Sequence, residues 1–321
     1  MNERFFFHTF PRPRRGEPEE ATFNRAIRIL RYMADTGLVL APEIVTWEIG
    51  VAGGTIDRLP ILQRRASFTE LALSELTGHS TVFGPISLSF DIDTLREAGV
   101  TPVIYVPQHS GMGSLSQLAT FCAKAAWHTR YVLERLQELK VMSDPDTAVA
   151  RFGKPLAPDC VFNLTNTDPK GKVVAQYAVS AANIQAIMKY IGYRNIPFDH
   201  SIGMLSVFLN MFYPTDNAYS GELLGYYRQR EWRLIGGVDF NARPIARSLT
   251  DKEKARLIKI DGEFWTRELT VEGKQQTRAA LALMYDPVQN WRFFDIVRNI
   301  YVPRRFEAEA RSIAGDKVIG Y

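Results

Sequence analysis

The sequence predicts a mixed α+β protein, with strands toward both ends of the chain and helices between them. Aromatic and β-branched runs at residues 5–10 and 297–302 are typical of strands. Apolar residues between positions 115 and 139 recur instead at helical spacing. A length of 321 residues with 46% hydrophobic residues suits one elaborated domain or two.

The first hundred residues are expected to begin with a strand, a charged loop and a helix. The aromatic run at 5–10 forms the strand, and the Pro11/Pro13 pair ends it. After a loop at 16–20, apolar residues from Phe23 to Leu38 follow a helical period, and Gly37 occupies the position of a helix C-cap. Further strands are expected at residues 38–44, 67–71, 84–90 and 102–106, with a short helix at 91–99.

Strand alternation is clearest at residues 84–90. Ile86, Leu88 and Phe90 share one face, and Ser87 and Ser89 share the other. This segment should therefore bury one side and present hydroxyls on the other.

The middle of the chain is expected to be a helical insertion or subdomain, residues 114–220, between two halves of the core, 1–113 and 221–321. Its helices are expected at 115–139, 178–190 and 202–212, with polar loops at 144–159 and 163–172. Beyond it we expect a strand at 230–238, a late strand at 297–302 and a helix at 306–313. Thr250-Asp251-Lys252-Glu253 is a capping box that opens another helix, which runs to about residue 258.

Composition and charge favour a cytoplasmic protein. The N-terminus carries charges at once and has too short an apolar run for a signal peptide, and no apolar stretch is long enough to cross a bilayer. Cys122 and Cys160 form neither a disulfide framework nor a metal site, and five histidines without ligand spacing argue against zinc. The net charge of +4 is mildly basic, and the basic clusters could contact RNA or a dinucleotide.

One block of residues carries a family resemblance. It comprises Arg65-Ala66-Ser67-Phe68-Thr69-Glu70-Leu71, His79, Phe83-Gly84, Pro102-Val103-Ile104-Tyr105 and, far downstream, Glu231-Trp232-Arg233. In order and spacing this block resembles the AbiGi-type abortive phage infection proteins, over about residues 5–106 and 226–302. Ser67 stands where that pattern usually has Cys, which argues against thiol chemistry there. The resemblance implies a phage-defence protein with a cognate toxin or antitoxin as its partner.

A more distant similarity is to ADP-ribosyltransferase toxins, in which a first strand ends in His or Arg and a late strand carries Glu. It implies a split antiparallel β core, NAD as the substrate, and protein or RNA as the acceptor. Glu231 would be the catalytic carboxylate, stabilising the oxocarbenium-like charge as the glycosidic bond breaks. The NAD-binding residues so implied are His8, Thr9, Ser67, Phe68, Thr69 and Tyr227. The implied substrate or phosphate contacts are Arg65, His79, Arg230 and Arg233.

Other interpretations of these residues stay open. Alternation places Glu231 and Arg233 on one strand face, where they could form a structural ion pair, with Trp232 as a core anchor on the other. The chain could also be a non-enzymatic antitoxin or sensor. A metal-dependent ribonuclease using Asp91, Asp93 and Glu231 is a third possibility, although Asp after a strand is more often a helix N-cap.

Overall fold

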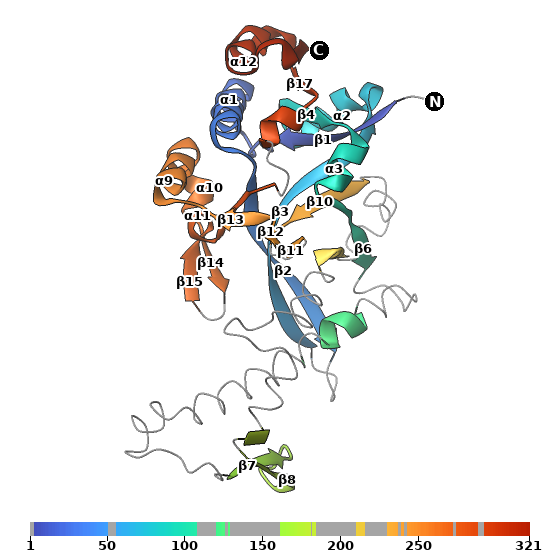
Figure 1. The fold of residues 1–321 in the computed structure, drawn as a ribbon, viewed down its shortest axis with the longest axis vertical. Helices are drawn as coiled ribbons and strands as arrows, with labels where there is room; N and C mark the ends of the chain where they lie inside the picture. Colours follow the sequence, from blue (N-terminus) through green and yellow to red (C-terminus); the bar gives the residue numbers. More distant parts are fainter. Residues whose placement is uncertain are drawn as a thin grey trace. The chain divides into compact units, whose positions relative to one another are not determined.

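The computed structural model describes residues 3–50, 56–107, 120–125, 128, 161–180, 182–183, 210–215, 230–236, 239–240, 243–271, 274–287 and 292–321. The chain divides into two compact units. The larger joins Met1–Ser116 to Asn210–Tyr321, and the smaller is Gln117–Leu209. Figure 1 traces both units along the chain. The functional residues discussed below all belong to the larger unit.

A ten-stranded, mainly antiparallel sheet organises the larger unit, in the order β13-β16-β2-β3-β1-β4-β17-β18, with β10 paired to β3 and β5 paired to β10. Among the described pairings in this sheet, β17 with β18 is the parallel one. Its strands are β1 (Arg4–Phe10), β2 (Val39–Gly50), β3 (Ile56–Ala72), β4 (Ile86–Phe90), β5 (Thr101–Pro102), β10 (Glu231–Ile235), β13 (Ala246–Ser248), β16 (Leu283–Tyr285), β17 (Asn299–Val302) and β18 (Val318–Gly320). The expected α+β class with a large antiparallel sheet is thereby confirmed.

The sheet forks along β3. Thr69 pairs with Phe7 of β1 and with Glu231 of β10, so β1 and β10 lie on opposite edges of β3. Arg65 pairs with Ala41 of β2 and with Ile235 of β10, which places β2 opposite β10 as well. Consequently β1 and β2 share one edge of β3 and diverge around residues 66–68. Cavities open beside this fork, and they are described below.

The two faces of the sheet differ in polarity because side chains alternate along each strand. Phe6, Phe68, Leu88 and Phe90 point into the main core, where each is fully buried. Their neighbours in sequence, on the other face, are largely polar. The alternation expected at residues 84–90 is confirmed, although β4 begins at Ile86 and both its faces are buried.

Helices cover the apolar face. α1 (Glu19–Thr36) buries Phe23, Ile27, Leu30 and Met33 against the core, which is the stripe that the helical spacing predicts. α9 (Asp251–Ile260) begins at the expected capping box, in which Thr250 Oγ1 accepts from the Glu253 backbone N–H and the Glu253 carboxylate accepts from Thr250 N–H. Among the described residues of the larger unit, the other α-helices are α2 (Leu76–Phe83), which borders the opposite face, α3 (Ile92–Glu97), α10 (Gly262–Trp265), α11 (Arg278–Leu281) and α12 (Glu307–Ala314).

Several expected elements have different bounds. The short strand at 67–71 is the end of the 17-residue β3, whose first half is rich in charged residues that hide the strand pattern. The single strand expected at 102–106 is two short strands, β5 and β6 (Ile104–Pro107), because Val103 N–H bonds to Glu231 O between them. α2 was not expected, since its apolar residues are too few to show a helical period.

In the smaller unit, one expected loop is a strand pair, and the expectation of a largely helical insertion stays a prediction. Its described residues include an antiparallel hairpin of β7 (Val161–Thr167) and β8 (Val173–Ser180). The loop expected at 163–172 therefore contains most of a strand and the turn, and the helix expected at 178–190 cannot begin at Ala178. Helix is described at residues 120–125 and 182–183. The loop at 144–159 lies outside the described residues, as does most of 202–212, of which Phe212 starts β9 (Phe212–Thr215).

Candidate functional site

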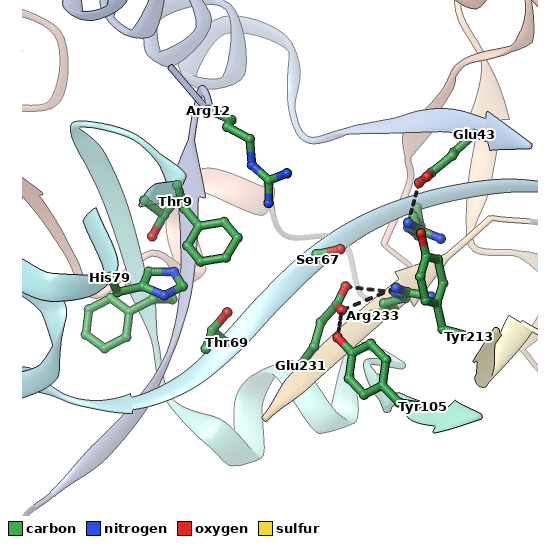
Figure 2. Close-up of a pocket in the computed structure, with 13 residues that line it drawn as sticks. Thr9, Arg12, Glu43, Ser67, Thr69, His79, Tyr105, Tyr213, Glu231 and Arg233 are labelled. Atoms are coloured by element: carbon green, nitrogen blue, oxygen red, sulfur yellow. Dashed lines mark hydrogen bonds and ion pairs between the residues drawn. The ribbon is translucent and has the colours of Figure 1, made fainter. Parts of the chain in front are cut away.

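A polar pocket of about 530 Å³ lies on the face of the sheet opposite the core. Three strands supply its floor in a shared register. Phe7 pairs with Thr69, Glu231 pairs with Thr69, and Arg233 pairs with Ser67, so these side chains point to the same side. Figure 2 shows them together with residues from the surrounding loops and helices. The lining residues are Phe7, Thr9, Arg12, Glu43, Arg65, Ser67, Thr69, His79, Phe83, Tyr105, Tyr213, Glu231 and Arg233.

Glu231 and Arg233 form the central contact of this pocket. Arg233 Nε donates to Glu231 Oε1 at 2.9 Å, and Arg233 Nη2 donates to Oε2 at 3.2 Å. The Tyr105 hydroxyl also donates to Oε2. Both carboxylate oxygens thus carry hydrogen bonds, and the Arg233 side chain is only 2% exposed. A pair this well enclosed holds both side chains in fixed positions.

The charge state of Glu231 follows from these contacts. Burial by itself raises the pKa of the carboxyl group. Attraction to Arg233, with hydrogen bonds from Arg233, Ser67 and Tyr105, outweighs burial and holds the pKa below its ordinary value. Burial raises the pKa of the Tyr105 phenol, and the nearby Glu231 charge raises it further. At neutral pH Glu231 is therefore ionised and Tyr105 is a neutral donor.

A second ion pair continues this row of charges. Arg65 donates to the Glu43 carboxylate and to the Gln63 amide oxygen, which Arg233 Nη1 also approaches at 3.5 Å. Because burial and the neighbouring Arg233 both oppose its positive charge, the pKa of Arg65 is lowered. The Tyr213 ring lies 5.1 Å from the Arg65 guanidinium and 4.6 Å from that of Arg233. Acidic, basic and aromatic groups thus alternate along this side of the pocket.

The other side of the pocket is lined by hydroxyl and aromatic groups. Thr9 Oγ1 and the Ser87 hydroxyl are 2.9 Å apart and share a hydrogen bond. The His79 ring stacks on Phe83 with ring centroids 4.4 Å apart. Burial lowers the pKa of His79 to about 4, so the ring is neutral at physiological pH. Figure 2 shows Arg12 pointing in from above, where its guanidinium lies 5.0 Å from the Phe83 ring.

The arrangement is suited to binding. It offers charged guanidinium groups, hydroxyls and aromatic surfaces around a cavity that could hold a small polar ligand. Its ionised carboxylates already accept from arginines, so neither faces the cavity as an unneutralised charge. Among the residues that the structure describes, no group of three His, Cys, Asp or Glu side chains is placed to hold a metal ion.

The pocket brings together most of the residues that the sequence singled out. Its lining includes Thr9, Arg65, Ser67, Thr69, His79, Glu231 and Arg233. Ser67 and Thr69 come from β3, and Glu231 and Arg233 from β10, which explains how segments far apart in sequence meet.

Other expected site residues lie elsewhere. His8 lies on the opposite face from Thr9, is half-buried, and hydrogen-bonds through Nδ1 to Ser67 O at 2.8 Å. Phe68 is fully buried in the core. Arg230, with a φ of 45°, pairs with Glu75 at 2.7 Å outside the pocket lining. Tyr227 lies outside the described residues.

The carboxylates proposed for a ribonuclease are also separate from the pocket. Asp91 occupies the N-cap position of α3, as its sequence context suggests, and its side chain pairs with Arg298 at 2.7 Å. Neither Asp91 nor Asp93 lines the pocket that contains Glu231. Trp232 packs against the core, 5.0 Å from the Phe6 ring, as expected of an anchor.

Sequence reasoning missed Tyr105, Tyr213, Glu43, Phe83 and Arg12 as pocket residues. Tyr105 belongs to the Pro-Val-Ile-Tyr segment of the family resemblance, so the sequence did mark this tyrosine as a candidate. Tyr213 reaches the site through the parallel pairing of β6 with β9. A pairing between segments so far apart in sequence leaves no local pattern from which it could be predicted.

The larger unit thus combines an α+β fold with a polar pocket on the face of its sheet away from the core. The profile of the family "Putative abortive phage resistance protein AbiGi, antitoxin" matches residues 61–263, more than half of the chain. The chain belongs to this AbiGi family. The match runs through the middle of the chain, which the recognised motifs had left uncovered.

The other comparisons give no further relative. No curated protein and no solved structure matches the chain. The similarity to ADP-ribosyltransferases therefore stays a prediction. No helix among the described residues is both long and apolar enough to cross a membrane.

Proposed function

We propose that this chain is the antitoxin of an abortive-infection pair and neutralises the toxin of that pair. The family match over residues 61–263 is the observation that carries the proposal, because that family is described as antitoxin. The resemblance in the sequence points to the same kind of paired system. The chain's partner is then a cognate toxin, and the chain itself needs no catalytic activity.

The contacts of Glu231 support a non-catalytic role. A catalytic carboxylate must be able to accept a hydrogen bond from the substrate or to stabilise charge that develops during the reaction. Both oxygens of Glu231 already accept from Arg233, and Oε2 also accepts from Tyr105. In addition, His8 lines a different cavity from Glu231. An antitoxin requires neither an available carboxylate nor a shared pocket for these two residues.

Paired expression tests the proposal. Colony counts are compared for cells that express the chain alone, the toxin of the same defence system alone, or both together. The expected result is normal growth with the chain alone, loss of colonies with the toxin, and recovery with both. Killing by the chain alone, or no recovery in the paired cells, would reject the antitoxin role.

A second candidate function is NAD-dependent ADP-ribosyl transfer. It is favoured by one observation, namely that Ser67, Thr69 and Glu231 line the same pocket. A ribose could bind there only by displacing Tyr105 or Arg233 from the carboxylate. The expected signature is release of nicotinamide from labelled NAD by the purified chain, reduced strongly in Glu231→Asp and retained in the matched variant Glu43→Gln. Absence of release from the wild-type chain rejects this candidate.

A further inference from the structure

A second cavity of about 600 Å³ lies beside the fork between β1 and β2. Its walls are mainly apolar and come from α1, α9 and α10 together with the ends of the forking strands. Ile29, Met33, Leu257, Phe264 and Trp265 are among its lining residues. Figure 1 shows the three helices beside one another next to β2. Its volume and apolar lining are those of a small-molecule site.

Positive charge exceeds negative charge in this lining. Arg14 and Arg25 both pair with Asp261, and Arg65 pairs with Glu43. These pairs use both acidic residues of the lining, Glu43 and Asp261. The lining also contains Arg12 and Arg278.

Arg12 and Arg278 are the arginines of this lining without a carboxylate contact among the described residues. The guanidinium of Arg278 lies 4.3 Å from the Phe264 ring, and that of Arg12 lies over Phe83. Burial lowers the pKa of Arg278, and repulsion by Arg267 adds to the effect, with only Glu43 opposing it. Two cations at a largely apolar cavity attract an anion.

Buried hydrogen-bond donors without acceptors also favour a ligand that carries acceptor oxygens. The Nε atoms of Arg25 and Arg278 are buried and have no acceptor among the described residues. Both arginines line this cavity. A buried donor without an acceptor is unfavourable, and an acceptor oxygen on a ligand would satisfy it.

We propose that this cavity binds a small organic anion, with its apolar body against Phe264 and Trp265 and its acidic group at Arg278. The acidic group is a carboxylate or a phosphate, and the body is an acyl chain or an aromatic ring. The site is distinct from the Glu231 pocket, although Arg12, Glu43, Arg65 and Ser67 line both. The inference does not rest on the antitoxin function, because it uses only the contacts of this cavity.

Fluorescent probes test the site in the full chain. Anilinonaphthalene sulfonate has an apolar ring system with one anionic group, and phenylnaphthylamine has the same rings without it. The sulfonate should bind the wild-type chain saturably at one site, and Arg278→Gln should weaken it at least tenfold. Arg278→Lys should retain most of the affinity. Arg31→Gln is the matched control, because Arg31 is exposed on α1 and outside the lining. Binding of the neutral probe should be the same for every variant.

Competition then separates the two sources of such an anion. Decanoate displaces the sulfonate if the cavity accepts fatty carboxylates, and adenosine monophosphate displaces it if the cavity accepts nucleotides. Displacement by either one supports the site and identifies its class of ligand. The proposal is overturned if neither competes, if Arg31→Gln weakens the sulfonate as much as Arg278→Gln, or if the neutral probe is lost in parallel.

Discussion

Glu231 and Arg233, two residues apart on β10, form a fixed pair of opposite charges. Alternation along β10 places both side chains on one face of the strand. Because β10 pairs with β3, Glu231 lies beside Thr69 and Arg233 beside Ser67 on that face. Arg233 is almost entirely buried, so its charge depends on the Glu231 carboxylate for compensation. Loss of either partner should therefore affect stability more than an exposed ion pair would.

Glu231→Gln is expected to lower the free energy of unfolding by about 3 kcal/mol, because it leaves the buried Arg233 without a counter-charge. Urea denaturation monitored by circular dichroism measures the loss. Glu70→Gln is the matched control, since Glu70 forms a more exposed pair with Arg4 at 3.5 Å and its loss should cost less than about 1 kcal/mol. Equal losses of unfolding free energy in both variants would show that the Glu231–Arg233 pair stabilises the fold no more than the exposed pair does.

His79 should make the unfolding free energy depend on pH. Its pKa is about 4 in the folded chain, against an ordinary value of 6.5. As the pH falls from about 6.5 toward 4, the unfolded chain binds a proton that the folded chain does not, and stability decreases. His79→Phe keeps a ring against Phe83 and removes this proton, so it should lose about 2 kcal/mol less than wild type between pH 7.5 and pH 5. Denaturation at both pH values measures the difference, and identical losses would contradict the assignment.

The alternation of side chains along a strand decides which of the expected site residues can share the pocket. Ser67, Thr69, Glu231 and Arg233 meet as expected. Thr9 lies with them, but adjacent residues on a strand face opposite ways, so His8 could not share that pocket with Thr9. The same rule separates Phe68 from Ser67 and Thr69. These distinctions were available from the sequence, whereas the arrival of Tyr213 depends on a long-range strand pairing.

At the level of secondary-structure elements, the fork in the sheet determines where the two cavities lie. It positions both cavities, and it arises because β1 and β2 pair with successive parts of one edge of β3. Strand β3 was expected to be short, and its full length becomes visible only through its partners. Local patterns predicted most strands and helices outside the middle of the chain. They could not reveal which strands share an edge, because that depends on contacts between distant residues.

Gly84 fixes the junction of α2 and β4 beside the pocket residue Phe83. Its φ is 133°, and a Cβ there would lie 2.5 Å from Phe10 C and from Pro11 O. Gly84→Ala is therefore expected to lower the unfolding free energy by about 1–3 kcal/mol. Gly78→Ala is the control within α2, because nothing lies within 4 Å of its Cβ position and alanine favours a helix by up to about 1 kcal/mol. Thermal unfolding should move in opposite directions for the two variants, and a neutral Gly84→Ala would contradict this description of the junction.

At the scale of the whole molecule, the sheet separates an apolar core from a polar pocket, and the helices on the core side enclose a second cavity. The family match assigns this chain to the AbiGi family, and the contacts of Glu231 fit the antitoxin description in its name. The fold class and the phage-defence family were predictable from the sequence. The expectation of a largely helical insertion stays a prediction, whereas the loop expected at 163–172 is a β-hairpin.

Depletion of this chain from cells that carry the intact defence pair is the most direct test of the antitoxin proposal. The chain is placed under a repressible promoter while its partner gene keeps its own, and viable cells are counted after repression. An antitoxin predicts that colony numbers collapse as the chain is lost and recover when it is supplied again. Undiminished colony numbers after depletion, together with killing when the chain alone is induced, would contradict the proposal and identify the chain as the toxin.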